Sequence, residues 1–416
     1  MSIVVLVWNY LKGRPLNTAL NTVLLSLGVS VIVVLIIVSN QLEQKIEQNS
    51  RGIDLVVGAK GSPLQLILCN IFHIDFPTGN INLAEAERIA RNRLVKNAIP
   101  LALGDSYQTF RIIGTTLDYA GMYDAELASG GWWEKDMEVT LGSMVAERLN
   151  KKEGDTFISA HGLSSGGHNH EESAFIVSGI LKPTHTVLDN LILTNVGSIW
   201  EIHGEHRDEQ EHDIQVADTS LTASPLIPSV PAGDSTMEIT SMLLQYRSPM
   251  AAIQLPRMIN SQTNMQAASP AFETARLFTI LGVGVDLLMV FAYVLIAISG
   301  LSIFIALYNS LKERRYDLAI MRTMGASRGK LVASILLEGS VLTFMGSVVG
   351  LLIGHGVMFL LAGTVDEMQR TGITGILFYE EEWILLAGSL LLGTLCALIP
   401  GIQAYKTDIS RVLASQ

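Results

Sequence analysis

The sequence predicts an α-helical membrane protein with four transmembrane helices and a large inserted α+β extracytoplasmic domain. Of its 416 residues, 49% are hydrophobic, which is too apolar for an ordinary soluble protein of this size. Four segments hold the roughly 20 apolar residues that a helix needs to cross a bilayer. The acidic residues concentrate between positions 43 and 240, which indicates a soluble domain inserted between two of these segments.

The four predicted spans are about Leu20–Ser39, Leu277–Ser310, Leu331–Gly363 and Trp383–Gln403. The first is interpreted as an uncleaved helix, because Pro15–Leu42 runs 28 residues without a charge and no small-residue cleavage site follows its apolar core. Three domains are predicted. Residues 1–40 form an N-terminal segment with the first helix, and residues 41–275 form an α+β domain. Residues 276–416 hold the other three helices and a short basic segment at 312–330.

Basic residues flank the spans at three places, and these flanks predict the orientation of the chain. They are Lys12 and Arg14; Lys312, Arg314, Arg315, Arg322, Arg328 and Lys330; and Lys406 and Arg411. With four spans, all three flanks fall on one side of the membrane, which the positive-inside rule makes the cytoplasmic side. Both termini are then cytoplasmic and the α+β domain lies outside. The net charge of −11 argues against nucleic acid as a partner.

The inserted domain shows short strand and helix patterns. Asn82 is expected to cap a helix over Leu83–Arg93, with Glu85 three residues on. The other predicted elements are strands at Ile53–Val57, Phe110–Thr115, Phe175–Leu181 and Thr156–Ala160, a helix at Leu141–Asn150 and a turn at Gly154-Asp155. Residues 213–236 have a linker composition, and Met242–Ala275 is expected to be a helix continuous with the second span.

Small residues recur every fourth position in two spans, which is the spacing of close helix packing in lipid. They are Gly346, Gly350 and Gly354 in the third span and Ser389, Gly393 and Ala397 in the fourth. Since glycine is common in transmembrane helices, the pattern alone leaves open whether these faces pack. Either a homodimer or a heterodimer would use them equally well.

Three ionisable residues fall within the spans, where a charge is costly unless it faces protein or water. Asp286 is interpreted as an interfacial or dimer-contact residue, with a relay or gate as the alternative. Glu338 is expected near the inner interface, paired with Lys330 or Arg328. His355 is expected to be a packed or interfacial polar residue.

The basic segment between the second and third spans carries a specific resemblance. Residues 313–327, ERRYDLAIMRTMGAS, followed by LLEG at 336–339, resemble the hinge of the permease family that includes MacB, LolC/LolE and FtsX. Residues 400–413, PGIQAYKTDISRVL, resemble the family's C-terminal motif, with Ile409-Ser410 in place of its usual Asp-Pro. Residues 141–149, LGSMVAERL, with Gly154-Asp155 after them, resemble a turn of the family's porter domain.

The resemblance implies the permease subunit of an ABC transporter in the bacterial inner membrane, working as a dimer, a homodimer being expected. A separate ATPase subunit would bind ATP and Mg²⁺, and its closure would move the periplasmic domain to export or extract a hydrophobic or envelope-associated substrate. The residues implied to contact the ATPase are Glu313, Arg314, Arg315, Asp317, Leu318, Met321, Arg322, Met324 and Gly325. Leu318, Met321 and Met324 are three apart and would form one apolar stripe on a helix. A basic segment that only contacts lipid headgroups is the alternative.

The chain is not expected to be an enzyme or to hold a cofactor. It contains no Walker A pattern, and the glycine-rich Gly58–Ser62 has the wrong spacing.

Histidine is concentrated in one part of the inserted domain, where seven of the nine lie between positions 161 and 212. Two patches, one with His168 and His170 and one with His203 and His206, carry neighbouring acids suited to Zn²⁺. Their spacing matches no rigid zinc site, so loose binding or none is favoured over a structural site.

Three functions remain open from the sequence. The first is an exporter or lipoprotein-extractor permease, with a periplasmic adaptor or a lipoprotein as a further partner. The second is an FtsX-like regulator or scaffold of periplasmic enzymes. The third is a membrane protein linked to zinc homeostasis, which depends on the histidine patches alone.

Overall fold

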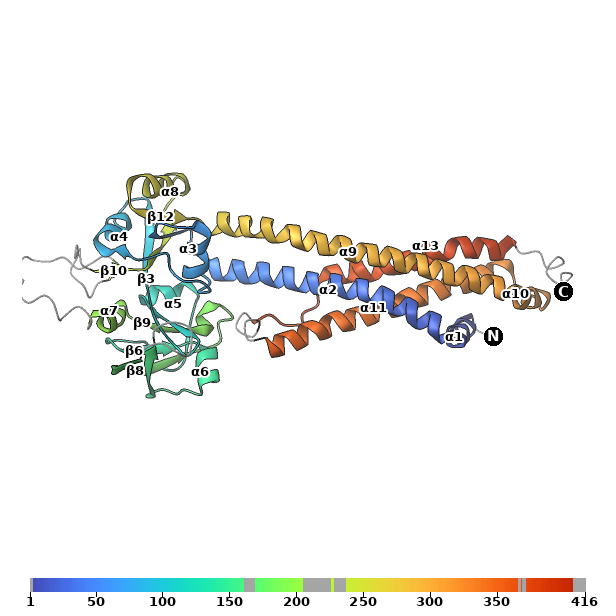
Figure 1. Ribbon diagram of the computed structural model, residues 1–416, viewed down its shortest axis with the longest axis horizontal. Helices are drawn as coiled ribbons and strands as arrows, with labels where there is room; N and C mark the ends of the chain where they lie inside the picture. The colour runs from blue at the N-terminus through green and yellow to red at the C-terminus, as the bar shows by residue number, and fades with distance from the viewer. Residues whose placement is uncertain are drawn as a thin grey trace, which may run out of the picture. The chain divides into compact units, whose positions relative to one another are not determined.

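The computed structural model describes residues 3–160, 169–204, 226–227, 237–365, 368 and 372–406 (Figure 1). The chain divides into two compact units, one of residues 1–43 with 281–416 and the other of residues 44–280. The first is a helical unit that contains the four predicted spans, and the second is a mixed α/β unit. The predicted fold class is confirmed. The predicted linker at 213–236 lies outside the described residues apart from 226–227.

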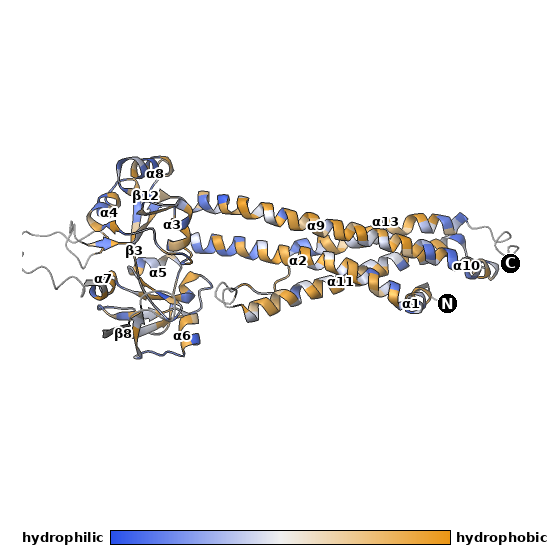
Figure 2. Ribbon diagram, viewed as in Figure 1, coloured by the Kyte–Doolittle hydropathy of each residue, from blue (hydrophilic) through white to orange (hydrophobic). Residues whose placement is uncertain are grey.

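In the part of the chain that the structure describes, four helices are long and apolar enough to cross a membrane: α2 (Pro15–Ser50), α9 (Pro270–Glu313), α11 (Arg328–Thr364) and α13 (Glu380–Lys406). Apolar residues dominate the central parts of all four (Figure 2). Each helix extends beyond its predicted span, because polar residues such as those of Gln41–Gln48 are good helix formers outside the bilayer. Among the described residues the unit also contains two short helices, α1 (Ile3–Gly13) and α10 (Arg315–Thr323).

The glycine face of α11 packs directly against α2. A Cβ atom added at Gly350 would lie 2.7 Å from Val29 Cβ and 2.9 Å from the Ser26 carbonyl oxygen. Gly346 and Gly354 approach Leu25 and Val33 at 2.9 Å and 2.7 Å in the same way. The three glycines therefore let two helices of one chain come into close contact.

The small-residue face of α13 packs against α11. A Cβ atom at Gly393 would lie 2.3 Å from Thr343 Oγ1 and 2.7 Å from the Gly339 carbonyl oxygen. Ser389 and Ala397 are buried along the same face. Both small-residue faces are thus occupied by contacts between helices of the same chain, which answers the question that the sequence pattern leaves open.

The mixed unit is built on one sheet of ten strands in the order β12-β1-β11-β3-β4-β9-β6-β8-β5, with β7 pairing with β3 and β8. Most pairs are antiparallel, whereas β4 with β9 and β6 with β8 are parallel. The strands of this sheet are β1 (Leu55–Ala59), β3 (Val95–Tyr107), β4 (Phe110–Gly114), β5 (Leu127–Gly130), β6 (Glu138–Leu141), β7 (Thr156–Ala160), β8 (Asn169–Leu181), β9 (Leu191–Thr194), β11 (Ser241–Tyr246) and β12 (Met265–Ala268). A separate pair joins β2 (Ile81–Asn82) and β10 (Glu238–Ile239).

Helices cover this sheet and enclose two apolar clusters. They are α3 (Pro63–Asn70), α4 (Leu83–Ala90), α5 (Leu117–Met122), α6 (Ser143–Leu149), α7 (Val196–Gly204) and α8 (Ala251–Gln262). Alternate residues of β11 enter opposite clusters, with Met242 and Leu244 in one and Leu243 in the other. The sheet is therefore buried on both faces at this strand.

Several local predictions are confirmed in this unit. The Asn82 side chain accepts a hydrogen bond from the Glu85 backbone N–H at 3.3 Å and begins α4 as expected. Gly154 has a positive φ of 85° in the turn before β7. The helix predicted from Leu141 begins later, at Ser143, because Leu141 is the last residue of β6.

The prediction of a continuous helix over Met242–Ala275 is wrong. This segment forms β11, α8 and β12 before α9 begins at Pro270. Met242, Leu243 and Leu244 are all buried, and a strand buried on both faces has the same unbroken apolar run as a buried helix.

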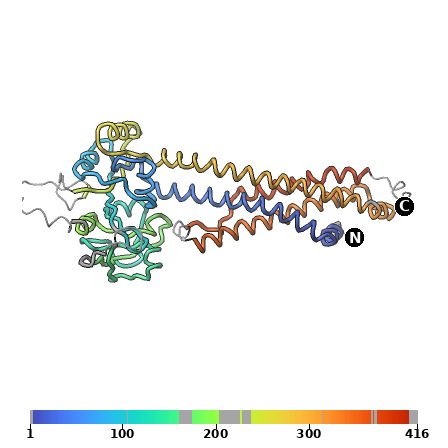
Figure 3. Tube along the Cα trace, in the orientation of Figure 1, coloured from blue at the N-terminus to red at the C-terminus, as the bar shows by residue number. Residues whose placement is uncertain are grey.

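The two long helices α2 and α9 connect to this unit through two strands that are neighbours in the sheet. The strand β1 follows α2, β12 precedes α9, and the two strands pair antiparallel, with Val56 opposite Ala268. Figure 3 shows both helices as unbroken segments of the chain. The last turn of α2 is also bonded to the mixed unit, since the Asn49 carbonyl accepts from the Tyr123 hydroxyl at 2.7 Å and its side chain accepts from Val187 N–H at 3.0 Å.

Candidate functional site

The candidate site is the short helix α10 together with the ends of α1, α9 and α11 that surround it, and it is called the α10 site below. The helix α9 ends at Glu313, and Arg314 stands at the N-cap of α10 with φ −94° and ψ 7°. The chain therefore bends at one residue between a long span and a short amphipathic helix.

The turn after α10 explains the sequence Met324-Gly325-Ala326-Ser327. Gly325 has a positive φ of 96°, and its N–H donates to the Arg322 carbonyl at 3.0 Å. The Ala326 N–H donates to the Met321 carbonyl at 3.0 Å, which completes a Schellman motif. Ser327 then caps α11 by accepting from the Lys330 N–H at 3.4 Å. Gly325 thus has a structural role, because this position favours a residue without Cβ.

One face of α10 is buried in the helical unit. Leu318 and Ala319 are 5% and 1% exposed. Leu318 belongs to an apolar cluster with Val7 of α1 and Leu331 of α11, and Met321 packs against the same cluster. This face anchors α10 to the chain's own helices.

The opposite face of α10 is exposed and apolar. Tyr316, Ile320 and Met324 are 43%, 37% and 81% exposed, and they follow one another at four-residue spacing. The expected stripe of Leu318, Met321 and Met324 is therefore corrected, since Leu318 faces inward and only Met324 belongs to the exposed face. The four-residue spacing of Tyr316 and Ile320 was present in the sequence, and it is the signal that identifies this face.

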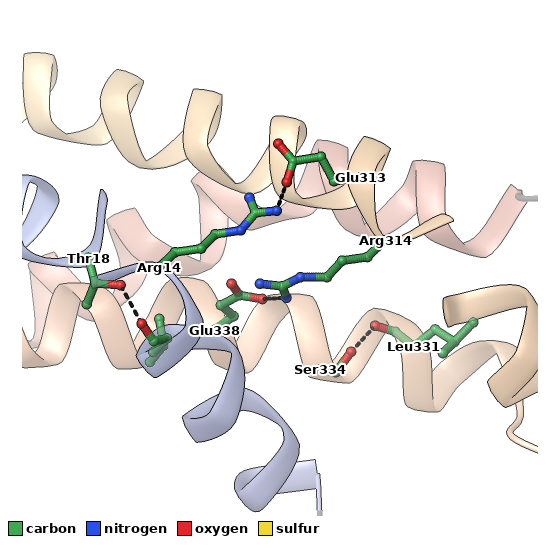
Figure 4. A network of polar contacts seen from close by, with 8 residues as sticks. Arg14, Thr18, Glu313, Arg314, Leu331, Ser334 and Glu338 are labelled. Atoms are coloured by element: carbon green, nitrogen blue, oxygen red, sulfur yellow. Dashed lines mark hydrogen bonds and ion pairs between the residues drawn. The ribbon is translucent and has the colours of Figure 1, made fainter. Parts of the chain in front are cut away.

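Two ion pairs lie behind α10 (Figure 4). Arg14, at the junction of α1 and α2, pairs with Glu313 at the end of α9. Arg314 pairs with Glu338 of α11, with 3.2 Å between Nη1 and Oε2 and both side chains about one-tenth exposed at 11% and 10%. These contacts join all four helices that meet at the site.

Tyr10 of α1 closes the same network. The guanidinium carbon of Arg314 lies 3.6 Å from the centroid of the Tyr10 ring, a cation–π contact. Burial raises the pKa of the Tyr10 hydroxyl, while the positive charge of Arg314 opposes that shift. Tyr10 and Arg14 were not among the predicted site residues, because they come from a segment that the sequence marks only as a basic flank.

The network changes the interpretation of three predicted residues. Glu313 and Arg314 were implied to contact an ATPase, but each makes an ion pair inside the chain. Glu338 was expected to pair with Lys330 or Arg328 and instead pairs with Arg314. Arg328 lies over the ring of Tyr405 at 5.5 Å.

Some of the other residues of the segment lie around a groove of about 440 Å³ between α1, α10 and α11. Asp317, Met321, Met324 and Lys330 contribute to its lining, with Leu6 and Tyr10 on the side of α1. Arg322 is half-buried in the last turn of α10, and the structure describes Arg315 by its backbone alone.

The predicted zinc ligands are described only in part. His168 and His206 lie outside the described residues, and His170 and His203 are described by backbone alone, in β8 and α7. In the described part of the chain, no group of three or more His, Cys, Asp or Glu side chains is placed to hold a metal ion. Zinc binding stays a prediction.

The other two ionisable residues of the spans lie away from the α10 site. Asp286 is exposed on α9. His355 of α11 is packed, with both ring nitrogens within hydrogen-bonding distance of oxygen atoms.

Comparison with known proteins shows that two regions of the chain match known protein families. Residues 18–224 match the MacB-like periplasmic core domain, and residues 289–409 match the FtsX-like permease C-terminal region. The uncharacterized ABC transporter permease YknZ of Bacillus subtilis (strain 168) is 28% identical over 137 residues. That alignment covers 32% of this chain and 31% of the relative, so the chain spans about a third of the length of the curated relative it matches.

Two solved structures also resemble the chain. The periplasmic region of MacB from Actinobacillus actinomycetemcomitans has 12% identity and a TM-score of 0.34, covering 56% of this chain and 98% of that one. The extracellular domain of the transporter YknZ from Gram-positive bacteria has 11% identity and a TM-score of 0.30, covering 52% and 99%.

The two matched regions follow each other along the chain in the same order as the α/β unit and the last three spans. The chain belongs to the MacB/FtsX-type family of ABC transporter permeases.

Proposed function

We propose that this permease couples a separate ATPase subunit to movement of its own α/β unit, and that this movement exports or extracts a hydrophobic or envelope-associated substrate. The ATPase binds ATP and Mg²⁺, and the permease carries out no chemistry of its own. The chain lies in the bacterial inner membrane as a pair of copies, with both termini in the cytoplasm and the α/β unit in the periplasm.

The exposed face of α10 supports a contact with the ATPase. Tyr316, Ile320 and Met324 present apolar side chains on a helix whose other face is anchored by Leu318. Amphipathic helices commonly bind a partner by placing such a face in a groove. Because α10 is held on its inner side, a force on its outer side acts on the helices behind it.

The ion pairs behind α10 support transmission of that force. Arg14 and Glu313 join the beginning of α2 to the end of α9, and Arg314 joins α10 to α11. At their other ends, α2 and α9 continue into β1 and β12, which pair with each other. A displacement of α10 would therefore be passed on to both α2 and α9, the helices that lead into the α/β unit. The proposal depends mainly on these ion pairs and on the pairing of β1 with β12.

The experiment is affinity purification of the full chain from its own bacterium, followed by identification of bound proteins and assay of ATP hydrolysis. The variants are Ile320→Glu and Met324→Glu, which place a charge on the exposed face of α10. The matched control is Ile253→Glu, because Ile253 is 65% exposed on α8 of the other unit. We expect an ATPase with wild type and the control, and its loss with both α10 variants.

Recovery of an ATPase that is unaffected by both α10 variants would reject the proposed contact, and recovery of none from wild type would reject the coupled transporter. Recovery of a periplasmic hydrolase with the complex, without an adaptor or a lipoprotein, would favour the regulator function. Cross-linking of two differently tagged copies in the membrane tests the proposed pair.

A further inference from the structure

A second polar cluster lies at the end of α11 opposite to the α10 site. The His355 Nε2 atom lies 2.8 Å from Glu382 Oε2 at the start of α13. The His355 Nδ1 atom lies 2.7 Å from the Gly375 carbonyl oxygen in the link between the two helices. The Glu382 side chain is 0% exposed, whereas that of His355 is 21% exposed and has access to water.

These two contacts require a specific number of protons. A neutral imidazole has one N–H, and both of its nitrogens face an oxygen atom here. If Nδ1 donates to Gly375, then Nε2 and an ionised Glu382 are two acceptors 2.8 Å apart; if Nε2 donates, the same conflict arises with the Gly375 carbonyl. Both hydrogen bonds form together only when the pair holds one more proton, on the imidazole or on the carboxyl group.

The surroundings fix the pair in place. Glu382 Oε1 accepts from the Tyr379 backbone N–H at 3.0 Å, and the ring of Phe378 stacks on that of His355 with an interplanar angle of 4°. Among the described residues, the ionisable group that acts on His355 is Glu382 of α13, while Tyr379 of the link lies within the influence of both Glu382 and Glu381. From α2 the polar group is the uncharged Gln41, and α9 adds apolar residues such as Ala292.

The contact with Gly375 holds the link against two helices. A Cβ atom at Gly375 would lie 2.5 Å from Phe359 N and 2.7 Å from the His355 carbonyl oxygen, so the link lies directly on α11. The preceding residue, Thr374, exchanges two hydrogen bonds with the Gln41 side chain of α2, at 2.7 Å and 2.8 Å. Two successive residues of the link are thereby tied to α11 and to α2.

We propose that His355 and Glu382 form a proton-dependent clamp that fastens the α11–α13 link to α11, next to the point where Thr374 holds the link to α2. With the extra proton bound, the link is held against both helices. When the proton leaves to water, the neutral imidazole keeps its one N–H toward the ionised Glu382, which is the stronger acceptor, and the hydrogen bond that holds Gly375 of the link to His355 is lost. The clamp thus makes the position of the link depend on pH, and it stands independently of the proposed ATPase contact.

The variant Glu382→Gln separates the proton from the hydrogen bonds. The glutamine amide group donates to Nε2 of a neutral imidazole, and its oxygen still accepts from Tyr379 N–H. Nδ1–H remains free to donate to Gly375. This variant therefore keeps the clamp closed without the extra proton, while His355→Ala removes the contact at every pH.

The test measures amide hydrogen exchange of residues 372–382 in the full chain in lipid nanodiscs, between about pH 5 and pH 9. Exchange rates are corrected for the chemical pH dependence of free amides. In wild type we expect protection at low pH and a loss of about tenfold or more at high pH, the effect of losing a hydrogen bond to a charged group. Glu382→Gln is expected to keep its protection throughout, and His355→Ala to lack it throughout.

Equal pH dependence in wild type and Glu382→Gln would overturn the proposal, and so would pH-independent protection in wild type. A second readout covers a His355→Ala chain that does not fold. In the nitrogen-15 NMR spectrum, the His355 signals should change with pH in wild type and stay those of a neutral ring in Glu382→Gln. An unchanged wild-type signal over the same range also rejects the clamp.

Discussion

Arg314 and Glu338 form an ion pair 3.2 Å long between two helices, and the same guanidinium covers the ring of Tyr10. Because both side chains are about one-tenth exposed, removing one charge leaves the other poorly solvated. We expect Glu338→Gln to destabilise the helical unit by about 2 kcal/mol, below the range for fully buried pairs. The measurement is thermal unfolding of the full chain in nanodiscs.

The control for this change is Asp317→Asn, which removes an exposed acid from α10 in the same region. Its effect should stay within about 0.5 kcal/mol, as for most surface substitutions. Similar shifts in Tm for the two variants would show that the Arg314–Glu338 pair contributes no more to stability than an exposed acid does.

Gly325 is expected to be sensitive to any side chain because of its φ of 96°. Gly325→Ala forces Cβ into a left-handed conformation that costs about 1–2 kcal/mol, although no atom lies within 4 Å of the added Cβ. Gly329→Ala is the matched control, since Gly329 lies in α11 with equally open space around it. We expect a lower Tm for the first variant and an unchanged or higher Tm for the second.

Gly350 provides a test of the packing between α2 and α11. Gly350→Ala places Cβ 2.7 Å from Val29 and 2.9 Å from a backbone oxygen of α2, so the helices must separate, at a cost of about 1–3 kcal/mol. Gly356, on the same helix, has no atom within 4 Å of an added Cβ. Gly356→Ala should therefore leave Tm nearly unchanged, and a loss as large as that of Gly350→Ala would contradict the packing argument.

His73 predicts a pH dependence in the α/β unit. Its Nε2 atom lies 2.9 Å from the Tyr119 hydroxyl, and burial, with a contribution from Arg111, lowers its pKa to about 3 from 6.5. Between these two values the unfolded chain binds a proton that the folded chain does not. Stability from this group is therefore complete above about pH 6.5 and falls as pH decreases toward 3, by at most about 1.4 kcal/mol per pH unit.

The measurement compares the Tm of wild type and His73→Asn from about pH 7 down to about pH 4. Asparagine tolerates the positive φ of 53° at this position and does not titrate. The difference between the two chains should narrow as pH falls, and His185→Gln, an exposed histidine, should follow wild type. Parallel curves for wild type and His73→Asn would exclude His73 as the source.

The sequence predicts best where a local pattern has one structural solution. Asn82 with Glu85 specifies a helix start, and four apolar segments with basic flanks specify the spans. It predicts less well where tertiary burial decides. Met242 lies in a strand covered on both faces, whose apolar run does not distinguish strand from helix.

The same limit applies to the α10 site. The segment was recognisable, but Leu318 and Met324 are both apolar in the sequence and lie in opposite environments in the fold, the first buried and the second exposed. The partner of Glu338 was also not predictable, because Arg314, Arg328 and Lys330 are all within one or two turns of the connection. In the structure it is Arg314, the N-cap residue of α10, that reaches Glu338.

The pairing of β1 with β12 has a consequence for how such permeases diversify. The chain leaves the helical unit through α2 and returns through α9, and the strands next to these helices are neighbours, as Val56 and Ala268 are partners. Adjacent strands lie about 4.8 Å apart, so entry and exit are close together. An exchange of everything between β1 and β12 for another fold with neighbouring terminal strands would leave the helices undisturbed. The helical unit and the α/β unit can therefore evolve as separate modules.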